Sequence, residues 1–185
     1  MTNNPEVFTY QMPFGFPGRV NRVGGGGKLD IEAQAVSQAS PVQAYGLAGQ
    51  IDAVSGDFRA MASTDTTIYG FLVSPFPTQP TSTSGFSGAV PLGTPGVPPT
   101  EGVVDVMLSG YMTVPLQANN AGAVTNPVKN GPVYVCIQNP PAGGYVGGVL
   151  GAADGGNTIA VNAYFMGPPD ANGNVEIAYS IKKVP

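Results

Sequence analysis

Residues 104–114 read VDVMLSGYMTV, and this stretch decides the fold class. Apolar side chains recur at every second position, with Gly110 keeping the register, while the intervening positions carry mostly polar side chains. Successive side chains of a β-strand point to opposite faces of a sheet, so a period of two is typical of a half-buried strand. We therefore expect one buried face made of Val104, Val106, Leu108, Met112 and Val114.

The same period of two recurs along the chain. It is found in residues 133–137, 159–165 and 175–181, and residues 67–73 indicate a further strand. The last two long runs are separated by the polar stretch 167–174, whose Asn-Gly pair is a strong hairpin signal. The predicted fold class is all-β, an antiparallel β-sandwich or jelly-roll-like barrel, with helix below about 15%.

Residues 29–39 fit two structures. Their content of Ala, Gln and Glu favours a helix, whereas the spacing of Ile31, Ala33 and Ala35 fits a strand. We favour the strand.

The chain divides into two parts by composition. Residues 1–28 form a predicted extended N-terminal arm, rich in aromatic side chains and ending in Gly24–Gly27, a flexible hinge. Residues 29–185 form a predicted single β domain. Within it, residues 74–102 are a long loop rich in Pro, Ser, Thr and Gly, either functional or a solvated insertion.

The charge of the chain excludes several classes of partner. Seven Lys and Arg against eleven Asp and Glu give a net charge of −4, so neither nucleic acid nor an anionic membrane is expected to bind. No apolar run reaches the roughly 18 residues of a membrane span, and the N-terminus lacks signal-peptide features. We expect synthesis in the cytoplasm. Charged residues make up only 10%, against about 25% in ordinary domains, which indicates a surface covered by partners.

Catalytic side chains are scarce. Histidine is absent, which removes the usual general base and the commonest metal ligand. Cys136 lies between apolar residues of a predicted strand and is expected to be a buried small hydrophobe.

Four further motifs fail as ligand sites. Residues 24–28 resemble a phosphate loop, but Leu29 replaces the Ser or Thr that binds magnesium, and residues 143–148 do not match the dinucleotide fingerprint. Residues 170–176 lack the glycine of an EF-hand and indicate a polar turn. The acids Asp52, Asp57 and Asp65 are expected in turns. We predict no enzyme, no cofactor and no metal.

The order of the segments resembles that of phage structural cement proteins. Residues 15–22 (GFPGRVNR) are similar to the family's early PG-(D/R)-(I/V)-(T/N)-R element, and residues 44–49 (AYGLAG) to its YG element. Residues 67–73 (TIYGFLV) resemble the following GILVR-like strand, with Ser74 in place of the arginine. Residues 104–114 are similar to the V-x-V-x-x-x-G-Y-x-x-V strand, and residues 129–135 (KNGPVYV) to the K-G-x-x-V-Y-V strand. The matches extend over residues 15–181.

The resemblance implies a structural protein on the exterior of a phage capsid. Its implied partners are the major capsid protein and further copies of itself, as a homodimer or homotrimer, and it implies no enzyme, cofactor or metal. We expect the protein to stabilise the capsid by bridging neighbouring subunits. Two alternatives stay open, a tail-fibre or receptor-binding β module that holds carbohydrate, and a virion-associated glycosidase with two carboxylates.

The N-terminal arm is the candidate contact with the capsid or a neighbouring copy. Buried aromatic side chains dominate the energetics of interfaces, and arginine pairs with carboxylates or carbonyls. The alternative is that the aromatic side chains cover the core of their own domain. The candidate contact residues are Phe8, Tyr10, Phe14, Phe16, Arg19 and Arg22.

Overall fold

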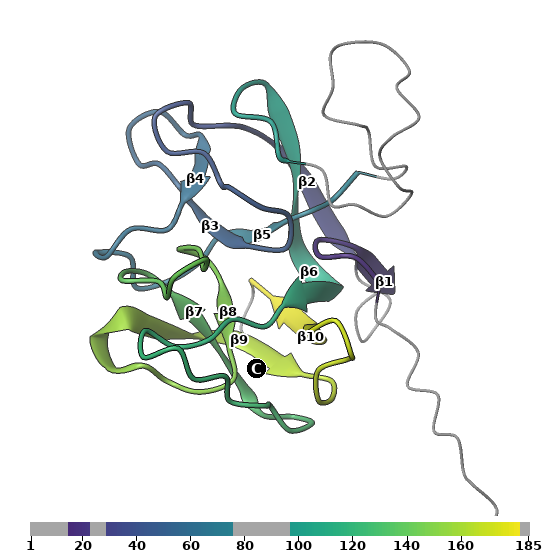
Figure 1. The fold of residues 1–185 in the computed structure, drawn as a ribbon. Helices are drawn as coiled ribbons and strands as arrows, with labels where there is room; N and C mark the ends of the chain where they lie inside the picture. The colour runs from purple at the N-terminus through teal and green to yellow at the C-terminus, as the bar shows by residue number, and fades with distance from the viewer. Residues whose placement is uncertain (1–14, 23–28, 76–96, 182–185) are drawn as a thin grey trace, which may run out of the picture.

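The computed structural model describes residues 15–22, 29–75 and 97–181 (Figure 1). Within these residues the chain forms β-strands and one short 3-10 helix, and no helix long and apolar enough to span a membrane. The elements in chain order are β1 (Val20–Arg22), β2 (Asp30–Ala35), β3 (Ala48–Ile51), β4 (Phe58–Ala60), β5 (Gly70–Leu72), β6 (Val103–Pro115), β7 (Pro132–Cys136), β8 (Val149–Leu150), η1 (Gly155–Asn157), β9 (Thr158–Phe165) and β10 (Asn174–Ser180).

Strand β6, the stretch that decides the fold class, lies at the centre of the sheet (Figure 1). Along one edge, its first half pairs with β5 and its second half with β10. Along the other edge, its first half pairs with β2 and its second half with β1. From β5 the sheet continues to β3 and β4, and from β10 it continues to β9, β7 and β8. All these strand pairs are antiparallel.

A β-bulge divides the buried side chains of β6 between two cores. One step along β2, from Asp30 to Ile31, corresponds to two steps along β6, from Ser109 to Met107. The extra residue changes the phase of the alternation, so odd and even positions exchange faces beyond it. The single buried face expected from the sequence is therefore split: one core takes Val104, Val106 and Leu108, and the other takes Met107, Met112 and Val114.

Backbone hydrogen bonds close the curled sheet into a barrel-like shape. The Ala48 N–H at the start of β3 donates to the Gly147 carbonyl just before β8, at 2.9 Å, and the Gln117 N–H donates to Val149 at 2.7 Å. Gly147 has a φ of +88°, and a Cβ there would lie 2.3 Å from the Ala48 carbonyl oxygen. Only glycine fits this closure.

Two hydrophobic cores lie on the two faces of the sheet. The inner core fills the curl, and its fully buried side chains include Phe71, Met107, Met112, Val114, Val133, Val135, Phe165, Val175 and Ile177. The outer core packs the segment 36–47 against β4, β5 and β6 through Val36, Val42, Tyr45, Leu47, Phe58, Leu72, Val104, Val106 and Leu108.

The predicted all-β antiparallel class is confirmed. Residues 29–39 contain the strand β2 and no helix, and the hairpin predicted around 167–174 joins β9 to β10. The strand expected over 67–73 is limited to residues 70–72, and β3, β4 and β8 were not predicted. The predicted hinge Gly24–Gly27 lies outside the described residues, between two strands that both pair with β6.

Candidate contact surface

The arm base, residues 15–22, is fixed to the body of the protein. Gly18 donates its N–H to the Thr113 carbonyl at 2.8 Å and accepts the Ser74 N–H at 2.9 Å. Its φ is +81°, and a Cβ there would lie 2.7 Å from Cβ of Tyr45. Val20 packs against the inner core. The arm predicted over residues 1–28 therefore has its described part integrated into the sheet.

Polar side chains hold the arm base over β6 and β10. Asn21 donates from Nδ2 to Thr113 Oγ1 at 2.9 Å and to Glu176 Oε1 at 3.1 Å. Glu176 is only 8% exposed, so the bond from Asn21 replaces a hydrogen bond to water for a buried carboxylate. Asn174 donates from Nδ2 to the Gly15 carbonyl at 3.2 Å, at the point where the described part of the arm begins.

Of the six predicted contact residues, the structure describes Phe16, Arg19 and the backbone of Arg22. Phe16 is 40% exposed, Arg19 is exposed, and the backbone of Arg22 pairs with Tyr111 in β6. The exposure of Phe16 is compatible with a contact role. Phe8, Tyr10 and Phe14 lie outside the described residues.

A second candidate surface lies on β2, which is exposed on both of its faces. Its even positions are polar: Tyr69 donates its hydroxyl to Glu32 and accepts a bond from Gln34 at 3.2 Å. Desolvation and the hydrogen bond to Glu32 raise the pKa of Tyr69 to about 12, so the phenol stays neutral near pH 7. The other face, with its neighbours, forms the contact strip: Leu29, Ile31, Ala33, Ala35 and Val103.

The apolar side chains of the contact strip are exposed to solvent. Val103 is 66% exposed, and Leu29 and Ile31 are about 40% exposed. Ala35 lies directly opposite Val103 in the β2–β6 register. Asp105, which is also exposed, lies directly opposite Ala33 on the same face, so the strip combines apolar side chains with an acid. Clustered exposed apolar side chains mark an interaction site more often than scattered ones do.

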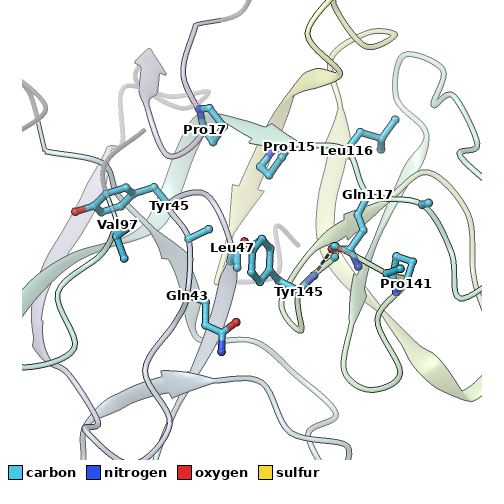
Figure 2. A pocket seen from close by; sticks show the side chains of 15 residues that line it. Pro17, Gln43, Tyr45, Leu47, Val97, Pro115, Leu116, Gln117, Pro141 and Tyr145 are labelled. Atoms are coloured by element: carbon cyan, nitrogen blue, oxygen red, sulfur yellow. Dashed lines mark hydrogen bonds between the residues drawn. The ribbon is translucent and has the colours of Figure 1, made fainter. Parts of the chain in front are cut away.

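A third candidate is the loop pocket, a cavity of about 490 Å³ between the arm base and the loops around β3, β6 and β7 (Figure 2). Its walls include Pro17, Tyr45, Leu47, Pro115, Gln117 and Tyr145, and none of the described residues that line it is charged.

The loop 141–148 is fitted closely around Gln117. Gln117 accepts the Tyr145 N–H on Oε1 at 2.8 Å, the bond drawn in Figure 2. A Cβ on Gly144 would lie 2.9 Å from the Gln117 side chain, and one on Gly148 would lie 2.2 Å from it. This fit positions the ring of Tyr145 in the pocket wall. In the sequence, Tyr145 stands in a predicted loop rich in Pro and Gly. The sequence analysis compared residues 143–148 only with the dinucleotide fingerprint and so missed this pocket.

The acids around Asp65 form a structural brace. Arg59 makes two hydrogen bonds to Asp65, at 2.8 and 2.9 Å, and lies 3.8 Å from Asp52. Burial alone raises the pKa of Asp65, but the bonds from Arg59 and from the Ala62 N–H hold that pKa below its usual value. A charge-neutralised pair of this kind is not the acid and base of a glycosidase.

Other candidate chemical groups also have structural roles. Cys136 is 2% exposed, and burial raises the pKa of its thiol, as expected of a buried hydrophobe. Asp170 accepts the N–H groups of Asn172 and Asn174 at 2.9 Å each, which is the polar turn that the sequence predicts. Among the described residues, no group of three or more Cys, Asp or Glu is placed to hold a metal ion.

Comparison with known proteins identifies relatives. The family model of the XM1 gp53 minor capsid protein matches residues 6–179. A chain in the solved capsid of Myoviridae phage XM1 is similar in fold, with a TM-score of 0.59 and 21% sequence identity. The alignment covers 97% of this chain and 98% of that chain. A search among curated proteins found no match.

Proposed function

The chain belongs to the XM1 gp53 minor capsid protein family, and we propose that it binds the exterior of a tailed-phage capsid and bridges neighbouring capsid subunits. Membership of this family makes it a capsid-associated structural protein of the virion and indicates a non-enzymatic role. The proposal adds the side of the shell, the partner and the contact residues. The proposed partner is the major capsid protein.

Charge favours the outer side of the shell. A protein on the inner side of a filled head faces DNA phosphates, which attract Lys and Arg and repel acids. This chain has a net charge of −4 and only seven Lys and Arg. Electrostatic repulsion from packaged DNA therefore opposes an internal position.

The observation that carries the bridging role is the exposure of β2 on both faces. An isolated domain gains little from a strand whose side chains stay in water, because burial of apolar surface supplies most of the stabilisation. A neighbouring subunit that covers the contact strip recovers this stabilisation on binding. Many copies on one shell then act together.

The arm is the second proposed contact. Phe8, Tyr10, Phe14 and Phe16 supply aromatic anchors, with Arg19 and Arg22 beside them at the arm base. Because residues 15–22 are bonded to β6, the segment proposed to reach a partner is residues 1–14. The proposal includes self-association as a homodimer or homotrimer, the usual closed arrangements.

The arm is tested by deletion. Removing residues 1–14 is expected to leave the melting temperature nearly unchanged while binding to undecorated heads falls by orders of magnitude. Deletion to residue 23 is the wrong cut, because it also removes β1. A shortened protein that folds and binds heads with full affinity removes the arm from the proposal, and one that unfolds shows that the arm covers its own core.

The position on the virion is tested by electron microscopy. The expected map shows this protein on the outer face of the capsid shell, with density of a neighbouring subunit against β2. Density on the inner face of the shell, or on the tail alone, contradicts the proposal.

A further inference from the structure

We propose that the open edge of β2 pairs with an extended, cationic segment of the neighbouring capsid subunit, which adds a strand to the sheet. The inference rests on the proposed binding of the capsid through β2. It adds the mode of contact, which is main-chain pairing, and the chemistry of the partner, a segment that carries Lys or Arg.

Within the described part of the chain, β2 pairs with β6 alone, and its other edge is bridged just beyond its end, between Val36 and Phe58. Val36 donates its N–H to Gly102, just before β6, at 2.9 Å. Ser37 donates its N–H in the opposite direction, to Phe58, also at 2.9 Å. The main-chain groups of successive residues alternate between the two edges of a strand. The odd positions of β2 therefore turn their N–H and C=O groups towards the open edge.

The composition of β2 leaves this edge available for pairing. Its sequence, DIEAQA, contains no proline and no lysine, the residues that commonly block the edge of a sheet. Its odd positions, Ile31, Ala33 and Ala35, are exposed and belong to the contact strip. An extended segment that pairs with this edge forms main-chain hydrogen bonds and covers the contact strip at the same time.

Acidic side chains flank the open edge on both faces of the sheet. Asp30 and Glu32 occupy even positions of β2, and Asp105 lies on the other face, opposite Ala33. Glu101, just before β6, is a fourth acid on this side of the sheet, and all four are exposed. None of them forms an ion pair with a lysine or arginine side chain that the structure describes. Complementary charge across an interface selects the partner, so these acids favour a segment with Lys or Arg.

The same acids disfavour a second copy at this edge. In a symmetric antiparallel pair of two β2 strands, corresponding faces lie together, so Asp30 and Glu32 of both copies would share one face. Like charges that lie opposite each other destabilise a pair of strands. The chain also carries a net charge of −4. A cationic segment of another protein is therefore a better occupant than a copy of this acidic chain.

The apolar side chains of the contact strip are expected to meet apolar side chains of the added segment, with Lys or Arg beside Asp105. A new charge of either sign at Val103 is then unfavourable, because the contact removes it from water.

A proline substitution tests the main-chain pairing on the full-length protein. Ala33→Pro removes an N–H that points to the open edge and leaves the bonds to β6 in place, so the fold is expected to persist. The matched control, Ala33→Ser, changes the side chain and keeps the N–H. Affinity for undecorated heads is expected to fall at least about tenfold for A33P and no more than about twofold for A33S. Melting temperatures check the folding. Wild-type affinity of a folded A33P overturns the inference.

Charge reversal tests the chemistry of the partner without altering the backbone. Asp105→Lys is expected to lower the affinity for heads at least about tenfold at low salt. Asp57→Lys makes the same change on the turn between β3 and β4 and is expected to lower the affinity no more than about twofold. High salt is expected to narrow the difference, because it screens exposed charges. Equal affinities of the two folded variants overturn the inference, also where A33P fails to fold.

The outcomes separate this inference from the proposed function. If the wild-type protein does not bind undecorated heads, the proposed function fails. If it binds, and A33P and D105K bind equally well, the inference fails and the proposed function stands. Light scattering on the isolated proteins tests for a second copy at the edge. A wild-type dimer that A33P dissociates assigns the edge to a second copy and overturns the inference.

Discussion

Strands β10 and β2 pair with opposite edges of the same strand, yet their surroundings differ completely. Six of the seven residues of β10 are buried, whereas none of the six residues of β2 is. Val175 and Ile177 in β10 fill the inner core, and Ile31 in β2 stays 39% exposed. Hydrogen bonding to β6 is common to both, so the difference lies in the side chains. The β10 side of β6, which we call the packed flank, holds the fold together. The β2 side, the open flank, is available to a partner.

The largest expected effect breaks the packed flank. Ile177→Ala is expected to lower the free energy of unfolding by about 2–5 kcal/mol, because it leaves a cavity in a fully buried site. The matched change on the open flank, Ile31→Ala, is expected to cost no more than about 0.5 kcal/mol. Chemical denaturation measures both. Similar losses for the two variants contradict the division into a packed and an open flank.

A smaller effect is expected at the closure of the barrel. Gly147→Ala places a methyl group 2.3 Å from the Ala48 carbonyl at a φ of +88°, so the loop has to shift. The substitution is expected to lower the free energy of unfolding by about 1–3 kcal/mol. The control is Gly56→Ala, at a φ of +78° with open space around it, which bears the backbone strain alone. Thermal unfolding is expected to rank Gly147→Ala as the more destabilising, and the reverse order refutes the closure contact.

The smallest expected effect lies in the brace around Asp65, outside both flanks. Its pKa is held below the ordinary value of 3.8, so the carboxylate stabilises the fold above that pH and loses the effect as the pH falls through the folded-state pKa. Asp65→Asn is expected to cost about 1 kcal/mol or less at pH 7. The free energies of unfolding of the wild-type protein and of Asp65→Asn are expected to converge as the pH falls from 7 to 2.5. A difference that grows towards low pH contradicts the assigned sign.

The packed flank was largely predictable from the sequence, because its long strands alternate apolar and polar residues. Residues 159–165 and 175–181 were assigned as strands for this reason, and β9 and β10 lie there. The alternation did not predict that the even positions of β10, Asn174, Glu176 and Ala178, are also buried. Glu176 is buried, and its carboxylate accepts a hydrogen bond from Asn21, 155 positions away in the chain, a contact about which alternation carries no information.

The rest depended on contacts between distant segments. Strands β3 and β8 have only four and two residues, too short for a periodic signal, and the bond from Ala48 to Gly147 forms only when the sheet curls. The bulge opposite Asp30 and Ile31 has no signature in residues 104–114. The loop pocket is built from five separate segments, so its residues share no pattern in sequence.

The open flank as a capsid contact is tested most directly by two matched valine substitutions. Val103→Asp introduces a charge into the contact strip, and Val54→Asp introduces the same charge on the turn after β3, where the side chain is 97% exposed. Binding of each variant to undecorated heads is titrated, with melting temperatures as the check on folding. We predict that V103D lowers the affinity by at least about tenfold, or about 1.4 kcal/mol, and V54D by no more than about twofold. Equal affinities for the two folded variants would contradict the assignment of β2 and its neighbours as the surface that binds the capsid.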